Sequence, residues 1–103
     1  MFGDVFLCQF PFTSGTGSKV RPALVLFDLL QDAIICRITS VIHTDPLDIS
    51  LQDWRIAGLL KPSVARIDRI VTAEKTIFLR RLGVLSPADL TVIRTTWNQQ
   101  MRL

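Results

Sequence analysis

Residues 22–39, PALVLFDLLQDAIICRIT, contain two apolar runs separated by a short connection. Residues 22–27 and 33–39 are short and rich in apolar and β-branched side chains, which favours strands. Residues 28–32 are few enough for a tight turn, so we expect the two strands to be neighbours. Because both faces of these strands are apolar, we expect both to be covered, as in a small barrel packed against a helix or a second subunit.

Strand-like runs also lie before and after this pair. We expect further strands at residues 5–10, 47–51, 64–71 and 76–79, with Arg80 closing the last one. The polar residues 13–19, which include two glycines, are expected to form the loop between the first two strands. The chain therefore reads as five or six short strands before its last element.

The last element is a helix that begins near Ser86. Ser86 is a typical N-cap, Pro87 suits the first helical position, and Asp89 stands three residues after the cap. One apolar face follows at spacings of three and four residues: Leu90, Ile93, Trp97 and Met101. We therefore predict a mainly β fold, an SH3-like small barrel with a C-terminal helix, formed by residues 1–103 as a single domain.

The composition is that of an ordinary globular domain. The chain has 103 residues, of which 49% are hydrophobic, and this excludes a disordered protein. Its apolar runs are far shorter than the ~20 residues of a membrane-spanning helix, and no secretory signal is visible. We expect a cytoplasmic protein with no membrane partner. The net charge of +3 is compatible with a nucleic-acid partner but does not by itself indicate one.

Common cofactor and metal motifs are not found in the sequence. Cys8 and Cys36 lie in apolar runs and form no zinc-binding spacing with the single histidine, His43, so we expect free core cysteines and no metal. Residues 15–19, GTGSK, lack the spacing and the following helix of a Walker loop, and Val20 stands where a dinucleotide motif needs its third glycine. No cofactor is expected.

One group of polar residues could form a site at the ends of two strands. Arg21 opens the strand at residues 22–27, and Thr39 and Ser40 close the strand at residues 33–39. If these strands pair antiparallel, a permanent cation and two hydroxyl groups lie side by side at one rim of the barrel. Such a cluster suits a phosphate group. Taken on the residues alone, a local hydrogen-bonding arrangement is the simpler interpretation.

Several segments in order resemble the PemK/MazF-like toxin family, and the similarity spans nearly the whole chain. They are residues 3–5 (GDV), 10–13 (FPFT), 17–19 (GSK), 21–26 (RPALVL), 38–40 (ITS), 58–59 (GL), 61–63 (KPS) and 82–86 (LGVLS). The resemblance implies an SH3-like barrel homodimer, the toxin of a bacterial type II toxin–antitoxin pair. It also implies a sequence-specific, metal-independent endoribonuclease that cuts single-stranded RNA, often mRNA, and an antitoxin whose acidic tail covers the RNA groove.

The resemblance also implies roles for individual residues. Arg21 and Thr39 match the family's catalytic pair, and residues 13–19 match the loop that borders the RNA groove. The RNA-binding residues that we expect are Thr13, Ser14, Ser18, Lys19, Arg37 and Ser40. Arg37 departs from the proline that many relatives have two residues before the threonine, which leaves the cleavage sequence open.

Some alternatives remain at this point. A similar barrel could bind without cutting, either as a gyrase-poisoning toxin or as an RNA-binding module; the presence of both Arg21 and Thr39 favours the nuclease. The general base is not identified, and the candidates are Asp4, His43 and Asp45. The rings that could stack on a base are Phe12, Trp54 and His43, although packing is the simpler role for each.

Overall fold

The computed structural model describes residues 1–11 and 17–103. Its strands are β1 (Asp4–Pro11), β2 (Ser18–Asp28), β3 (Asp32–Thr39), β4 (Asp48–Ser50), β5 (Val64–Glu74) and β6 (Phe78–Val84). A short 3-10 helix, Lys75–Ile77, joins β5 to β6, and α1 (Pro87–Gln100) ends the fold. No helix in these two ranges is both long and apolar enough to cross a membrane.

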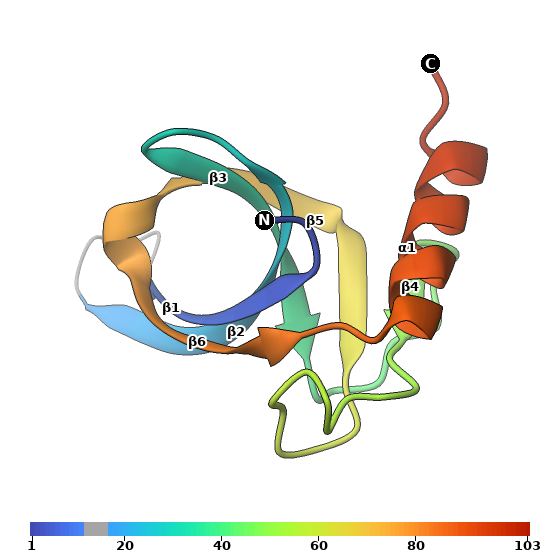
Figure 1. Ribbon diagram of the computed structural model, residues 1–103, viewed down its shortest axis with the longest axis horizontal. Helices are drawn as coiled ribbons and strands as arrows, with labels where there is room; N and C mark the ends of the chain where they lie inside the picture. The colour runs from blue at the N-terminus through green and yellow to red at the C-terminus, as the bar shows by residue number, and fades with distance from the viewer. Residues whose placement is uncertain (12–16) are drawn as a thin grey trace.

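The strands form one antiparallel sheet in the order β4-β5-β3-β2-β1-β6. The sheet curls strongly, and α1 stands to one side of it (Figure 1). The curled sheet is barrel-like, although the ladder of described strands is open and has β4 and β6 as its edges. The prediction of a mainly β, barrel-like fold with a C-terminal helix is confirmed.

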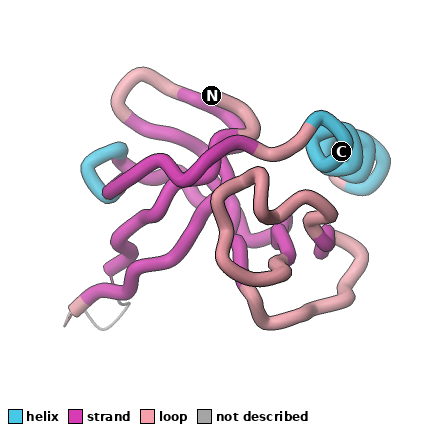
Figure 2. The backbone as a smooth tube through the Cα atoms, turned by 60° about the horizontal axis from the view of Figure 1, so that its bottom comes forward, coloured by secondary structure: helices cyan, strands magenta, loops and turns pink. Residues whose placement is uncertain are grey.

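Irregular pairing helps to explain the curl. Cys36 of β3 pairs with Ile70 of β5, but the next residue, Arg37, pairs with Arg66, so residues 67–69 are extra in β5. A smaller irregularity interrupts the β2–β3 ladder. Extra residues in one strand bend it and increase its twist. The long connections between β3 and β5 gather at one side of the bent sheet (Figure 2).

Both faces of β2 and β3 are covered, as the apolar runs predict. Leu24 and Cys36 belong to the larger core cluster, which extends under α1 through Ile93. Val25 and Ile35, their neighbours along the strands, belong to a second buried cluster. Side chains alternate between the two faces of a strand. The β2–β3 pair is therefore the layer that separates two apolar cores.

The two cysteines, Cys8 and Cys36, are buried and free, as expected. Burial raises the pKa of Cys8 to about 11. Burial, together with the negative charge of Asp68, raises the pKa of Cys36 to about 12. Both groups are therefore neutral thiols at physiological pH and serve as small apolar core residues.

The predicted end of the last strand is wrong. Arg80 does not close it, because β6 begins at Phe78 and continues to Val84. The reason is its pairing with β1: Arg80 lies opposite Leu7, and Val84 lies opposite Asp4. An edge strand can carry arginines on its open face, so charge alone does not end it. Ser18 and Lys19, expected in a loop, belong to β2.

The predicted start of the helix is confirmed. The Ser86 Oγ accepts a hydrogen bond from the Asp89 amide at 3.2 Å, and Pro87 occupies the first turn. Ile93 is buried in the main core, and Leu90 and Trp97 pack against that core. The helix therefore covers the sheet with the face that its spacing predicts.

Gly58 allows the loop after β4 to pack closely against β6. Its φ is +83°, and a Cβ at this position would lie 2.2 Å from the Leu82 carbonyl oxygen. We expect Gly58→Ala to destabilise the fold by about 1–3 kcal/mol or more, because the strained backbone and the clash add together. Urea denaturation measures the change. Leu60→Ala, in the same loop at a side chain 93% exposed, is the control and should change stability by less than about 0.5 kcal/mol.

Candidate active site

A groove of about 620 Å³ lies where β2 begins and β3 ends. One of its walls is the loop after β4, and β6 also contributes side chains. Leu7 of β1 pairs with Arg80 of β6 on one side and with Pro22 of β2 on the other, and all three residues line the groove. The groove therefore crosses the sheet and depends on the pairing of β6, β1 and β2.

Arg21 and Thr39 both line this groove. Ala23 of β2 pairs with Arg37 of β3, and Arg21 and Thr39 stand two residues beyond this pair on their strands. Side chains two residues apart on a strand share a face. The register thus brings the guanidinium and the hydroxyl group to one face of the same groove.

Each of these two side chains has a defined local contact. The Arg21 Nη1 donates to the Val20 carbonyl oxygen at 3.2 Å, and the side chain is half-buried. Thr39 is 8% exposed, and its Oγ1 accepts a hydrogen bond from the Val41 amide at 3.1 Å. That bond uses one lone pair and leaves the hydroxyl proton available for donation. Thr39 can therefore hold a phosphate oxygen while it orders the turn after β3.

The groove is strongly cationic. Its described lining contains five Lys and Arg side chains and no Asp or Glu: Lys19, Arg21, Arg37, Lys61 and Arg80. The ion pairs found among the described residues use other cations, namely the N-terminus, Arg66, Arg69, Lys75 and Arg81. Clustered cations with no neutralising acid beside them attract polyanions. The arrangement suits a chain of phosphate groups.

Most of the predicted RNA-binding residues come together here, but not all. Lys19, Arg37 and Ser40 line the groove with the predicted catalytic pair. Ser18 does not line it; its Oγ accepts a hydrogen bond from the Gln9 Nε2 at 2.7 Å. Thr13 and Ser14 lie outside the described residues.

Sequence reasoning did not find Lys61 and Arg80. Both line the groove, from the loop before β5 and from β6. Lys61 lies in a segment that carries the family resemblance, so that segment was the available signal. Predicting Arg80 would have required the β1–β6 register. That register places Arg80 in the groove, while Arg81 forms an ion pair with Asp4 at 3.1 Å.

The three candidates for a general base lie outside the groove lining. Asp4 pairs with Arg81 and the N-terminus, and Asp45 pairs with Arg66. His43 is half-buried in the segment between β3 and β4. No carboxylate or imidazole is found among the described lining residues. Within residues 1–11 and 17–103, no cluster of three or more His, Cys, Asp or Glu side chains could hold a metal ion.

The aromatic candidates for base stacking are also placed elsewhere. Trp54 is half-buried against the main core, and the Arg55 guanidinium lies 4.5 Å from its ring centroid. Phe12 lies outside the described residues. Neither Trp54 nor His43 belongs to the groove lining, so the described part of the groove presents no aromatic ring.

Comparison with known proteins identifies the family. Residues 1–101 match the protein family described as "PemK-like, MazF-like toxin of type II toxin-antitoxin system". The chain belongs to this family. The resemblance carried by the short segments is thereby confirmed, and no curated protein sequence matches the chain as a relative.

Solved structures share the fold of this PemK/MazF-like chain at low sequence identity. MazE-MazF (Form-II) from Deinococcus radiodurans matches with a TM-score of 0.77 at 19% identity, over 96% of this chain and 92% of that chain. An endoribonuclease in complex with its cognate antitoxin from Mycobacterial species matches with a TM-score of 0.74 at 22% identity, over 98% of this chain and 93% of that chain. The Mycobacterium tuberculosis toxin MazF-mt6 matches with a TM-score of 0.75 at 18% identity, over 93% of each chain.

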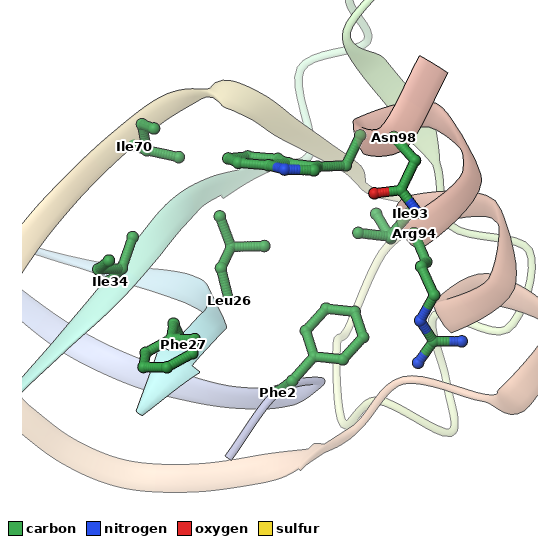
Figure 3. Close-up of a pocket in the computed structure, with 9 residues that line it drawn as sticks. Phe2, Leu26, Phe27, Ile34, Ile70, Ile93, Arg94 and Asn98 are labelled. Atoms are coloured by element: carbon green, nitrogen blue, oxygen red, sulfur yellow. The ribbon is translucent and has the colours of Figure 1, made fainter. Parts of the chain in front are cut away.

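A second cavity, of about 430 Å³, has a different character. It lies between α1 and the sheet, and Phe2, Leu26, Ile34 and Ile70 point toward one another across it (Figure 3). Arg94 is the one charged residue in its described lining, and its guanidinium lies 5.5 Å from the centroid of the Phe2 ring. An almost entirely apolar cavity offers no groups for phosphate chemistry, so the cationic groove is the candidate active site of this toxin-family chain.

A buried ion pair supports the segment that leads away from Thr39. The Arg66 Nε donates to the Asp48 Oδ1 at 2.9 Å, with side chains only 8% and 1% exposed, and the Arg66 Nη2 contacts Asp45. Burial alone would raise the pKa of Asp48, but hydrogen bonds from Arg66 and the Asp45 amide bring it below its ordinary 3.8. The pair joins β4 to β5 and fixes the turn at Asp45.

We expect Asp48→Asn to lower stability at neutral pH by an amount approaching the roughly 3–5 kcal/mol that loss of one partner of a buried pair costs. A depressed pKa stabilises the fold fully above the ordinary 3.8, and this contribution is lost as the pH falls through the folded-state value. The stability gap between wild type and variant should therefore narrow below about pH 4. Urea denaturation from pH 7 to pH 3 measures it, and a gap independent of pH would contradict the assignment.

Proposed function

We propose that this chain is a metal-independent endoribonuclease that cleaves single-stranded RNA, the toxin of a type II toxin–antitoxin system, with residues 1–103 as one toxin domain. The observation that carries the proposal is the register of β2 and β3, which brings Arg21 and Thr39 into one groove. Family membership supports it. A guanidinium and a hydroxyl group in an acid-free cationic groove suit a phosphodiester better than they suit a neutral ligand.

The charges of the groove favour RNA as the substrate class. Lys19 and Arg37 lie on β2 and β3, while Lys61 and Arg80 lie on the loop before β5 and on β6. Cations that come from four segments of the chain can contact successive phosphates of an extended strand. Specific recognition of RNA mostly uses single strands, whose bases are free to be read at their edges.

In the proposed reaction the RNA supplies its own nucleophile. The 2′-hydroxyl oxygen attacks the adjacent phosphorus and loses its proton to water. The bond to the 5′-oxygen breaks and that oxygen takes a proton from water, which leaves a 2′,3′-cyclic phosphate and a 5′-hydroxyl end. Arg21 stabilises the extra negative charge on the five-coordinate phosphorus with its planar, permanently charged guanidinium. Thr39 donates a hydrogen bond from its hydroxyl group to a phosphate oxygen and thereby aligns the scissile group.

The proposed protein partner is an antitoxin with an acidic segment. An acidic peptide matches the groove in charge and would exclude RNA from it by occupying Lys19, Arg37 and their neighbours. Among the similar structures, the mycobacterial endoribonuclease is in complex with its cognate antitoxin, which supports a partner of this kind. We place the pair in the cytoplasm, where mRNA is available.

Arg21→Ala should abolish RNA cleavage while the fold is retained, because Arg21 lies at the rim of the sheet and not in either core. Loss of one group that stabilises a developing negative charge typically lowers the rate by roughly 10²–10³-fold. The assay incubates a long single-stranded RNA in EDTA and maps the fragment ends. Wild type should give discrete fragments with 5′-hydroxyl ends.

Arg69→Ala is the matched control, since Arg69 is an exposed arginine outside the groove lining. It should cut at the wild-type rate. Cleavage by Arg21→Ala at the wild-type rate would show that the catalytic assignment is wrong. RNA that wild type binds but leaves intact would instead favour a non-catalytic barrel of this family.

We also propose that the chain is a homodimer. One copy leaves a large apolar surface uncovered: Phe27 is 60% exposed, Ile70 42% and Val71 50%, near the apolar cavity. Exposed apolar patches of this kind mark interaction surfaces. Equilibrium sedimentation at micromolar concentration should give twice the chain mass of 11.6 kDa. A single species of 11.6 kDa would refute the dimer.

A further inference from the structure

Asp89 is a buried carboxylate that makes two hydrogen bonds to a loop far away in the sequence. It lies in the first turn of α1 and is 1% exposed. Its Oδ1 accepts from the Gln52 amide at 3.0 Å, and its Oδ2 accepts from the Asp53 amide at 2.9 Å. Hydrogen bonds to a charged carboxylate are roughly twice as strong as neutral ones. The two bonds therefore clamp the start of this loop to α1.

The clamped loop is the one that forms a wall of the groove. Residues 53–59 are folded by backbone hydrogen bonds, including Gly58 N to Arg55 O at 3.0 Å and Leu59 N to Trp54 O at 3.1 Å. Gly58 closely contacts Leu82 of β6. Residues 58–61 then line the groove and end in the cation Lys61. The loop is thus held by Asp89 at its start and by Gly58 at its far end.

Ordinary helix capping does not account for this arrangement. An acid three residues after an N-cap serine typically turns back to the cap amide, in the reciprocal pairing of a capping box. Here the Ser86 Oγ accepts from the Asp89 amide, but both carboxylate oxygens of Asp89 are directed to Gln52 and Asp53. The two amides bond to different oxygens of Asp89, and a carboxylate provides two acceptor oxygens where a carboxamide provides one.

We infer that Asp89 is a positioning residue for RNA binding, which sets the place of the groove wall at residues 58–61 without touching the substrate. The inference rests on the proposed function for its link to RNA. Asp89 does not belong to the groove lining, so it acts through the loop. Its loss should weaken the contact that Lys61 makes with RNA, while Arg21 and Thr39 keep their places on β2 and β3.

The test compares Asp89→Asn with wild type on an RNA oligonucleotide that contains one mapped cleavage site. Asn keeps the size of Asp but turns an NH₂ group toward one amide, so one hydrogen bond is lost. When chemistry is slower than RNA dissociation, KM reports binding. We expect KM to rise about tenfold and kcat to stay within about twofold.

Ile93→Val is the matched control. It removes a methyl group from the buried side of the same helix and leaves both Asp89 hydrogen bonds in place. Partial unfolding alone would lower the apparent kcat in proportion to the folded fraction and would leave KM unchanged. We expect this result for Ile93→Val. An unchanged KM in Asp89→Asn would overturn the inference.

Amide hydrogen exchange tests the clamp without RNA. In wild type the Gln52 and Asp53 amides should be protected, and in Asp89→Asn these two amides and that of Gly58 should exchange faster. Fast exchange of the Gln52 and Asp53 amides in wild type would overturn the inference even if the variant does not fold. If wild type fails to cut RNA, the proposed function fails, whereas protected amides would still support the clamp.

Discussion

The antiparallel register of β2 and β3 sets the geometry of the groove. Ala23 lies opposite Arg37 in that register, and Arg21 and Thr39, which stand two residues beyond this pair on their strands, both line the groove. A slip of one strand by one residue would turn its side chains to the other face of the sheet. Such a slip would disrupt the packing of Leu24 and Cys36 in one core and of Val25 and Ile35 in the other. Core packing therefore determines the geometry of the polar groove.

The chain keeps acids and cations apart, and each does a different task. The groove lining that is described carries cations without carboxylates, which leaves its positive field available for a polyanion. Two buried carboxylates lie behind it: Asp48 pairs with Arg66 and supports the turn after β3, and Asp89 holds the start of the loop after β4. Acids thus support the walls of the cationic groove from behind, where they do not neutralise its positive charges.

Sequence reasoning succeeded where the deciding interaction is local. The N-cap at Ser86 is a contact between residues three apart, and the strands at residues 22–27 and 33–39 follow from apolar runs joined by a short turn. Sequence reasoning failed where pairing with a distant strand decides where an element ends. The strand β6 passes Arg80 because β1 provides its hydrogen-bond partners, and no pattern within residues 76–84 shows this.

Short segments of the sequence were enough to predict the family and a mainly β architecture with a final helix, and the family resemblance implied that Arg21 and Thr39 are the catalytic pair. These follow from short motifs and from spacing, which tertiary contacts do not alter. The folded structure was needed to show that Lys61 and Arg80 join Arg21 in one groove, that Ser18 bonds to Gln9, and that Asp89 holds a loop. Each of these facts is a contact between different strands, or between a loop and another element, so it depends on strand register and loop docking and not on a pattern within one segment.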